Sequence, residues 1–175
     1  MAAAEAPSKR EIRTAQLVLR PFRSDDVEAI AGYANDEDYR RYLRPTQPSA
    51  KEFVAHNISV DWSVQCSWVI TLDDAIVGTA FLGINDEDDA AELSCLLAPC
   101  YWGQGIGTEA AGAALEHAFV GLDLAKVVGR TDPRHDAALG LMKTLGMQPH
   151  GATHTDEVIY ELTRDEWSRA RSGAR

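Results

Sequence analysis

Cysteine is scarce in this sequence, and long apolar runs are missing from it. The three cysteines, Cys66, Cys95 and Cys100, form no C-x-x-C pair, and an odd number does not close a disulfide framework, so we expect reduced thiols. No apolar run approaches the roughly 18 residues of a membrane-spanning helix. The first residues, interrupted by Glu5 and Pro7, do not form the apolar core of a signal peptide. We therefore expect a cytoplasmic protein that does not enter a membrane.

Positive charge is also in short supply. The chain has 17 Lys and Arg against 27 Asp and Glu, which gives a net charge of −10 and an isoelectric point near 4.9. Nucleic-acid binding needs clustered basic side chains that face phosphates. The charge balance therefore argues against a nucleic-acid partner and suits a cationic one.

The chain has the length of one globular domain, with 45% hydrophobic and 25% charged residues among 175. Residues 1–13 are small and polar without periodicity, and we expect a disordered tail there. Residues 14–175 are expected to form a single domain without internal repeats. Alternation of period two predicts strands that begin at Leu17, Trp68, Ile76, Ala91, Ala125 and Val158, with a hairpin turn at 73–75.

Capping patterns predict the helices between these strands. Acidic residues lie three positions after a polar residue in the pairs Asp25 and Glu28, Ser49 and Glu52, and Thr163 and Glu166. Two further helices are expected over residues 107–119 and 136–145, the second ended by a glycine at 146. Strands and helices together predict a mixed α/β domain.

Three glycines stand at every second position before the helix at 107–119. Gly103, Gly105 and Gly107 follow a predicted strand that ends near Ala98. A helix start leaves backbone amides unpaired and carries a partial positive charge, and glycine lets such amides converge on an anion without a Cβ in the way. A glycine-rich connection without a ligand would account for one or two glycines, but it accounts less well for three in register at a helix start, so we expect this turn to bind a phosphate group.

Two common phosphate-binding loops do not fit the glycines. A Walker loop needs Lys and then Ser or Thr after its last glycine, and here Thr108 and Glu109 follow. The dinucleotide fingerprint needs a glycine where Thr108 stands, and it follows the first strand of a domain rather than the fourth. Neither loop is therefore favoured.

The segment Tyr101-Trp102-Gly103-Gln104-Gly105-Ile106-Gly107-Thr108-Glu109-Ala110 resembles the acetyl-CoA loop of the GCN5-related N-acetyltransferase (GNAT) superfamily. Its Tyr-Trp-Gly variant is similar to the branch of ribosomal-protein N-terminal acetyltransferases (RimJ/RimL-like). The opening strand at 17–22, the acidic pair at 25–26 and the Leu-Gly-Met at 145–147 resemble that branch in the same order. The resemblance covers roughly residues 15–163.

The resemblance implies a mixed, mostly antiparallel sheet with helices on both faces and with splayed fourth and fifth strands. The pantetheine arm of acetyl-CoA would lie in the gap, paired with the backbone of Leu96, Leu97 and Ala98, and a bulge amide in that strand would polarise the thioester carbonyl. The pyrophosphate would lie on the loop, and the implied cofactor contacts there are Trp102, Gly103, Gln104, Gly105, Ile106, Gly107 and Thr108. The resemblance also makes a homodimer plausible.

Four positions depart from the family pattern. Trp102 replaces a Gln or Arg, which is usual for this branch. His135 stands where the family commonly has an Asn that contacts the cofactor, with Ala138 in place of a following Ser, and we expect His135 to take over that contact. Met142 stands where many relatives carry a Tyr that protonates the leaving thiolate. A thiol pKa near 8.5 makes coenzyme A thiolate a tolerable leaving group without such an acid.

The candidate catalytic residues are Glu92 and Ser94, because superfamily members often place a proton-accepting carboxylate on the fourth strand. Alternation puts both on one face of the strand and Cys95 on the other, as a packing residue. No metal is expected, because Pro149 and Gly151 deny a helix to the pair His150 and His154. The segment 40–45 and the tyrosines before it are expected to form one wall of the acceptor site.

The sequence thus predicts an acetyl-CoA-dependent N-acetyltransferase that acts on a primary amine. Two alternatives stay open. The first is a non-catalytic acyl-CoA-binding or sensor module of the same fold, suggested by the missing Asn and Tyr. The second is a nucleotide-binding protein that uses the glycines for ATP.

Overall fold

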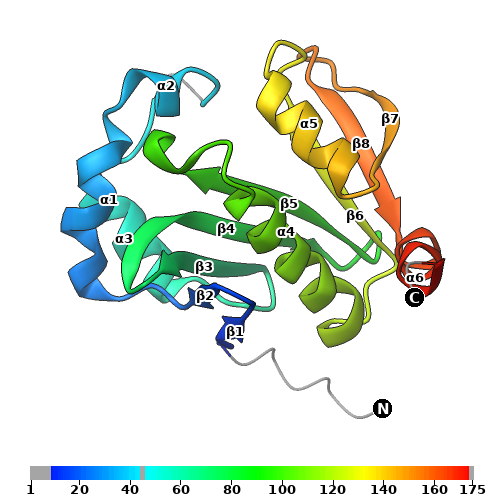
Figure 1. The fold of residues 1–175 in the computed structure, drawn as a ribbon, viewed down its shortest axis with the longest axis horizontal. Helices are drawn as coiled ribbons and strands as arrows, with labels where there is room; N and C mark the ends of the chain where they lie inside the picture. The colour runs from blue at the N-terminus through cyan, green and yellow to red at the C-terminus, as the bar shows by residue number, and fades with distance from the viewer. Residues whose placement is uncertain (1–8, 44–45, 174–175) are drawn as a thin grey trace.

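The computed structural model describes residues 9–43 and 46–173, and its centre is one sheet of eight strands (Figure 1). The strand order is β1-β2-β3-β4-β5-β6-β8-β7, and neighbouring strands are antiparallel except for β5 and β6, which are parallel. The strands are β1 (Ile12–Arg13), β2 (Leu17–Arg20), β3 (Gln65–Leu72), β4 (Ala75–Asn85), β5 (Ala90–Leu97), β6 (Lys126–Thr131), β7 (Gln148–Ala152) and β8 (Val158–Thr163). This mixed, mostly antiparallel sheet confirms the predicted fold class.

Helices cover both faces of the sheet. They are η1 (Ser24–Asp26), α1 (Val27–Ala34), α2 (Glu37–Arg40), α3 (Ala50–Ser59), η2 (Pro99–Tyr101), α4 (Ile106–Glu116), η3 (His117–Gly121), α5 (Asp136–Thr144) and α6 (Arg164–Gly173). Because side chains alternate along β3, Trp68 and Ile70 pack in one core cluster with Leu115 of α4, while Val69 packs in a second with Ile30 of α1. No helix in the described part of the chain is long and apolar enough to cross a membrane.

Six predicted strands are confirmed as β2, β3, β4, β5, β6 and β8, and two strands are additional. The expected tail boundary at residue 13 is wrong, because Ile12 and Arg13 form β1 and pair with Leu19 and Val18 of β2. The first eight residues of that expected tail lie outside the described residues. Strand β7 lacks apolar alternation and contains Pro149, which only an edge strand tolerates.

The predicted helix caps have different outcomes. Ser49 and Glu52 exchange hydrogen bonds as expected, since Glu52 accepts the Ser49 N–H at 2.9 Å and the Ser49 hydroxyl accepts the Glu52 N–H at 3.3 Å. The Asp25 and Glu28 cap is wrong. Asp26 instead accepts the Arg23 N–H at 2.7 Å, and its buried carboxylate takes two hydrogen bonds from the Arg20 guanidinium at 2.7 and 3.0 Å.

Strands β5 and β6 part after three residue pairs, which confirms the predicted splay. They pair only from Ala90 with Lys126 to Glu92 with Val128, whereas β5 pairs with β4 along its whole length, as far as Leu97. The predicted bulge in β5 is wrong, because its register to β4 is unbroken. The irregularity lies between β3 and β4 instead, next to Ile70. The second half of β5 therefore has one unpaired edge.

Candidate functional site

The gap between the parted strands is a cleft of about 570 Å³. One wall is the free edge of β5 with the glycine loop and the first turns of α4, and the other is the end of β6 with α5 (Figure 1). Tyr39, Tyr42 and Leu43 complete the wall on the α2 side. A second, more open groove of about 1160 Å³ lies between β1, α4 and α6. The cleft is the stronger candidate because a free strand edge and a helix start both converge on it.

The direction of the backbone groups along β5 follows from two hydrogen bonds. The Ala98 N–H donates to the carbonyl of Val77 in β4 at 2.9 Å, whereas the N–H of Ile84, which pairs with Ala91, donates away from β5 to Val64 at 2.7 Å. In an antiparallel pair, alternate residues direct their backbone groups at the partner strand. The N–H and C=O groups at positions 93, 95 and 97 therefore face the cleft.

This register revises the predicted pantetheine contacts. Leu97 faces the cleft through its backbone, as expected. Leu96 turns its backbone toward β4, although its side chain lines the cleft. Ala98 is 4% exposed, and its carbonyl already accepts the Tyr101 N–H at 2.9 Å, so its backbone has no free group for a ligand.

The glycine loop holds its shape through backbone conformations that favour glycine. Gly103 and Gly105 have φ angles of 71° and 80°, and a Cβ at either would meet nothing within 4 Å. Conformation rather than crowding therefore requires these glycines, and open space remains above the loop. Gly105 is the N-cap of α4, so the unpaired amides of the first helical turn follow directly.

Two side chains fasten the loop to the protein. The indole N–H of Trp102 donates to the carbonyl of Leu97 at 2.9 Å, and the Gln104 amide donates to the carbonyl of Cys100 at 2.9 Å. Of the loop residues named from the sequence, Trp102, Gly103, Gly105, Gly107 and Thr108 line the cleft. Gln104 does not, and neither does Ile106, whose side chain is buried in the core.

The two candidate catalytic residues have different surroundings. Ser94 is exposed and lines the cleft. Glu92 belongs to the last residue pair before the strands part, and its Oε2 atom lies 2.7 Å from Nη1 of Arg130. Glu92 is not part of the cleft lining, and its carboxylate is already engaged by the Arg130 guanidinium.

Cys95 is a packing residue, as the alternation predicts. It packs against the core cluster that contains α4, and burial raises the pKa of its thiol to about 12. The thiol is therefore protonated and unreactive near neutral pH. Among the described residues, no group of three or more His, Cys, Asp or Glu side chains lies close enough to hold a metal ion.

His135 lies at the N-terminal end of α5 and lines the cleft. Its ring stacks on Tyr42, with centroids 4.0 Å apart and planes inclined by 14°, and its Nδ1 atom lies 3.3 Å from the Thr131 hydroxyl. Burial lowers the pKa of His135, against the opposing charges of Asp132 and Asp136. The imidazole is therefore neutral near pH 7.

Part of the segment that was expected to form an acceptor wall lines the cleft. Tyr39 and Tyr42 line the cleft, and burial raises the pKa of Tyr39 to about 12, so its hydroxyl stays protonated. Arg41 is paired with Asp38 at 2.5 Å, while positions 44 and 45 lie outside the described residues. Met142 is 8% exposed and packs beside Gly129, so this position offers no proton donor to the cleft.

Comparison with known proteins finds an acetyltransferase family model and acetyltransferase relatives that match this chain. The family model described as an acetyltransferase (GNAT) domain matches residues 16–148. The uncharacterized N-acetyltransferase YnaD of Bacillus subtilis (strain 168) is 25% identical over 90% of this chain and 99% of its own length. The spermidine N(1)-acetyltransferase of Escherichia coli (strain K12) is 24% identical over 82% of this chain and 76% of its own length.

The fold is shared with solved structures as well. RimJ of Mycobacterium smegmatis, solved in complex with CoA-disulfide, superposes with a TM-score of 0.80 at 18% identity and covers 98% of both chains. The family match extends over most of the chain and includes the whole of β5, the glycine loop and α4. The protein therefore belongs to the GNAT family of acetyltransferases.

Proposed function

We propose that this protein transfers the acetyl group of acetyl-CoA to a primary amine. The observation that carries the proposal is the unpaired half of β5, whose backbone groups face a cleft that ends at the glycine loop and the start of α4. A free strand edge binds an extended amide-containing chain, and a helix start binds an anion. Acetyl-CoA contains both groups in that order, since its pantetheine arm carries two amides and leads to a diphosphate.

The residues of the cleft suit the two parts of this substrate. The backbone groups of Leu93 and Cys95 and the N–H of Leu97 would pair with the pantetheine amides, since the Leu97 carbonyl already accepts the Trp102 indole N–H. The amides of residues 103–108 would hold the diphosphate, with Trp102 fixing the loop through its bond to Leu97. His135, at the N-cap of α5, would contact the arm from the opposite wall.

The pKa of the acceptor amine determines how strong a base the reaction needs. A lysine-like amine with a pKa about 3.4 units above pH 7 costs about 4.6 kcal/mol to present neutral, whereas an α-amino group with a pKa near 7.7 costs only about 1 kcal/mol. The first kind of amine needs a strong base, and the carboxylate of Glu92 is already paired with Arg130. An amine of low pKa, such as an α-amino group, therefore fits the cleft better, with Ser94 as the polar side chain beside it.

The relatives name two classes of acceptor. RimL, the ribosomal L7/L12 alpha-N-protein acetyltransferase, acts on a protein α-amino group, and the spermidine acetyltransferase acts on a polyamine, whose amines have a high pKa. The argument from Glu92 favours the first class. The neutral product of the reaction, coenzyme A thiol, needs only a proton from solvent after the thiolate leaves.

A non-catalytic acyl-CoA-binding module is the second candidate. The paired Glu92 and the apolar Met142 favour it, because neither supplies a free base or acid to the cleft. Such a module would bind acetyl-CoA and release no coenzyme A. Turnover with any amine would exclude it.

Several further features belong to the proposal. A single domain that includes β1 is proposed to work in the cytoplasm, where the free thiols of Cys66, Cys95 and Cys100 stay reduced. The net charge of −10 supports a protein without a nucleic-acid partner. A homodimer remains a prediction from the family resemblance, which light scattering would test.

The test is a coenzyme A release assay with a thiol reagent. The panel contains peptides with free N-termini, spermidine, free amino acids and aminoglycosides, each with and without acetyl-CoA. We expect turnover with at least one amine, and faster turnover with α-amino groups than with high-pKa amines at pH 7. Silence across the panel, together with tight binding of acetyl-CoA, would replace the enzyme by the binding module.

A further inference from the structure

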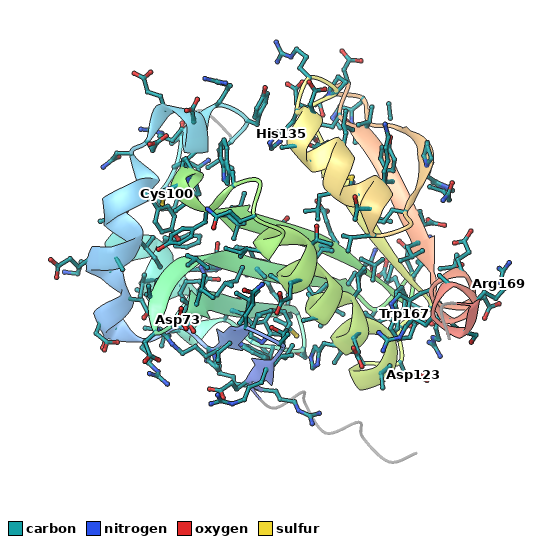
Figure 2. All side chains as sticks on the ribbon, in the orientation of Figure 1. Asp73, Cys100, Asp123, His135, Trp167 and Arg169 are labelled. Carbon is teal, nitrogen blue, oxygen red and sulfur yellow. The ribbon has the colours of Figure 1, made fainter. Side chains whose placement is uncertain are left out.

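One contact joins the two walls of the cleft at its mouth. Tyr42 follows α2 on the first wall and His135 begins α5 on the second, and both line the cleft. Their rings stack with centroids 4.0 Å apart, and the Tyr42 hydroxyl donates to the carbonyl of Arg134 at 3.2 Å. Figure 2 shows His135 in the gap between the α2 segment and α5. We call this pair the bridge.

The α5 end of the bridge is braced by its own turn. The Arg134 N–H donates to Asp132 at 2.8 Å, and its guanidinium forms an ion pair with the same carboxylate at 2.6 Å. The His135 ring lies 3.3 Å from the Thr131 hydroxyl. These contacts hold the carbonyl of Arg134 and the ring of His135 in place, so Tyr42 docks on a preformed surface.

The bridge closes the open end of the cleft. The pairing of Glu92 with Val128 closes the cleft where β5 and β6 part, and the bridge closes it at the opposite end. We infer that the bridge encloses the pantetheine arm of acetyl-CoA, so that Tyr42 and His135 act as positioning residues that hold this substrate and slow its exit. This inference rests on the proposed function. It adds Tyr42, a residue of the acceptor wall, to the residues that retain acetyl-CoA.

The interaction energy of the bridge sets how much the exit rate of acetyl-CoA should change when the bridge is lost. A stacked aromatic pair and one neutral hydrogen bond together correspond to a change of about tenfold to a hundredfold in a rate of exit. Such a bridge is strong enough to retain a bound arm and weak enough to open during turnover.

The test measures the binding and release of acetyl-CoA by stopped-flow fluorescence, with the indole of Trp102 in the cleft as the reporter. Tyr42→Ala removes the stack and the hydrogen bond, and we expect its release rate to rise about tenfold or more. Tyr42→Phe keeps the ring, and we expect a rise of about threefold. His150→Ala, a matched loss of an exposed histidine outside the cleft, should leave the release rate at the wild-type value.

A double variant shows whether the two residues act as one unit. Tyr42→Ala combined with His135→Ala should raise the release rate by less than the product of the two single effects, because each single variant already loses the stack between the two rings. Additive effects of the two changes would overturn the inference. A release rate for Tyr42→Ala within twofold of the wild-type rate would also overturn the inference. This outcome counts if the melting temperature of Tyr42→Ala is unchanged, or if the release rate of Tyr42→Phe is also within twofold of the wild-type rate.

Failure of this inference is distinguishable from failure of the proposed function. A wild-type protein that binds acetyl-CoA and acetylates an amine, with Tyr42 variants that release acetyl-CoA at the wild-type rate, would overturn only the bridge. A wild-type protein that does not bind acetyl-CoA would overturn both.

Discussion

Replacing Gly105 by glutamate is expected to abolish acetyl-CoA binding while the protein remains folded. Gly105 has a φ of 80°, and a side chain there costs roughly 1–2 kcal/mol because the left-handed conformation brings Cβ close to the carbonyl. The melting temperature of a chain of this size should therefore fall by about 2–8 °C. The new carboxylate has open space above the loop, since a Cβ at this position meets nothing within 4 Å.

The loss of affinity follows from charge. A carboxylate about 5 Å from each unit of diphosphate charge costs about 3 kcal/mol per charge at an effective dielectric constant near 20, which is more than a hundredfold in the dissociation constant. Isothermal titration with coenzyme A measures it. Gly105→Ala, which adds the strain without the charge, should weaken binding much less than Gly105→Glu.

Gly146 provides a matched control. It has a φ of 82° and equally open surroundings, but it lies at the end of α5 and outside the cleft lining. Gly146→Glu should lower the melting temperature by a similar amount and leave coenzyme A affinity near the wild-type value. If Gly105→Glu bound coenzyme A within about threefold of the wild type, the diphosphate site would not be at this loop, and the reasoning would be refuted.

Four further predictions follow from single contacts. Trp102→Phe keeps an aromatic ring but removes the indole N–H that bonds to Leu97, so the KM for acetyl-CoA should rise about fivefold at unchanged kcat. An unchanged KM in steady-state kinetics would exclude a role for this bond. Glu92→Gln should lower kcat by less than about tenfold, because loss of a general base costs about 100-fold or more, and a larger loss in the coenzyme A release assay would restore Glu92 as the base. Asp26→Ala leaves the partly buried Arg20 without its partner and should destabilise the protein by about 3–5 kcal/mol in urea denaturation. The control Asp25→Ala changes an exposed neighbour and should cost less than about 0.5 kcal/mol, and equal effects of the two variants would contradict the importance of the pair. Burial opposes ionisation of Glu109, but hydrogen bonds from Thr14 and Gln16 outweigh it and lower the pKa of this carboxylate. The contribution of Glu109 to the free energy of unfolding should therefore be complete above about pH 4.5 and should disappear as the pH falls through the folded-state pKa. Glu109→Gln should flatten this part of a stability profile measured from pH 7 to pH 3, and an unchanged profile would count against these bonds.

Local sequence signals predicted local structure well. The cap of α3 depends on two residues three positions apart, Ser49 and Glu52, and it forms as expected. The hairpin at 73–75 is also present, and both Asp73 and Asp74 adopt the positive φ that such a turn requires. The glycines at 103 and 105 have the left-handed conformation that only their residue type adopts at low cost.

Features that depend on distant partners were not predictable in this way. Asp26 rather than Asp25 caps the start of η1, the turn before α1, and Arg20 of β2 holds its carboxylate there. The pairing of Glu92 with Arg130 joins residues 38 positions apart. The direction of the β5 backbone depends on its register with β4, which places positions 93, 95 and 97 on the free edge. Alternation along one strand gives the faces of its side chains but does not give the side on which its amides point.

The half-paired strand β5 has a consequence for the stability of the whole molecule. An arm that pairs with the free edge would stand in for the strand segment that β6 does not supply, so the native sheet would be complete only in the loaded protein. At a ligand concentration about 100 times its dissociation constant, this completion adds about 2.7 kcal/mol to the free energy of unfolding. Amide protons on the free edge of β5 would then exchange with solvent much more slowly, and the free energy of unfolding would be highest in a cell rich in acetyl-CoA.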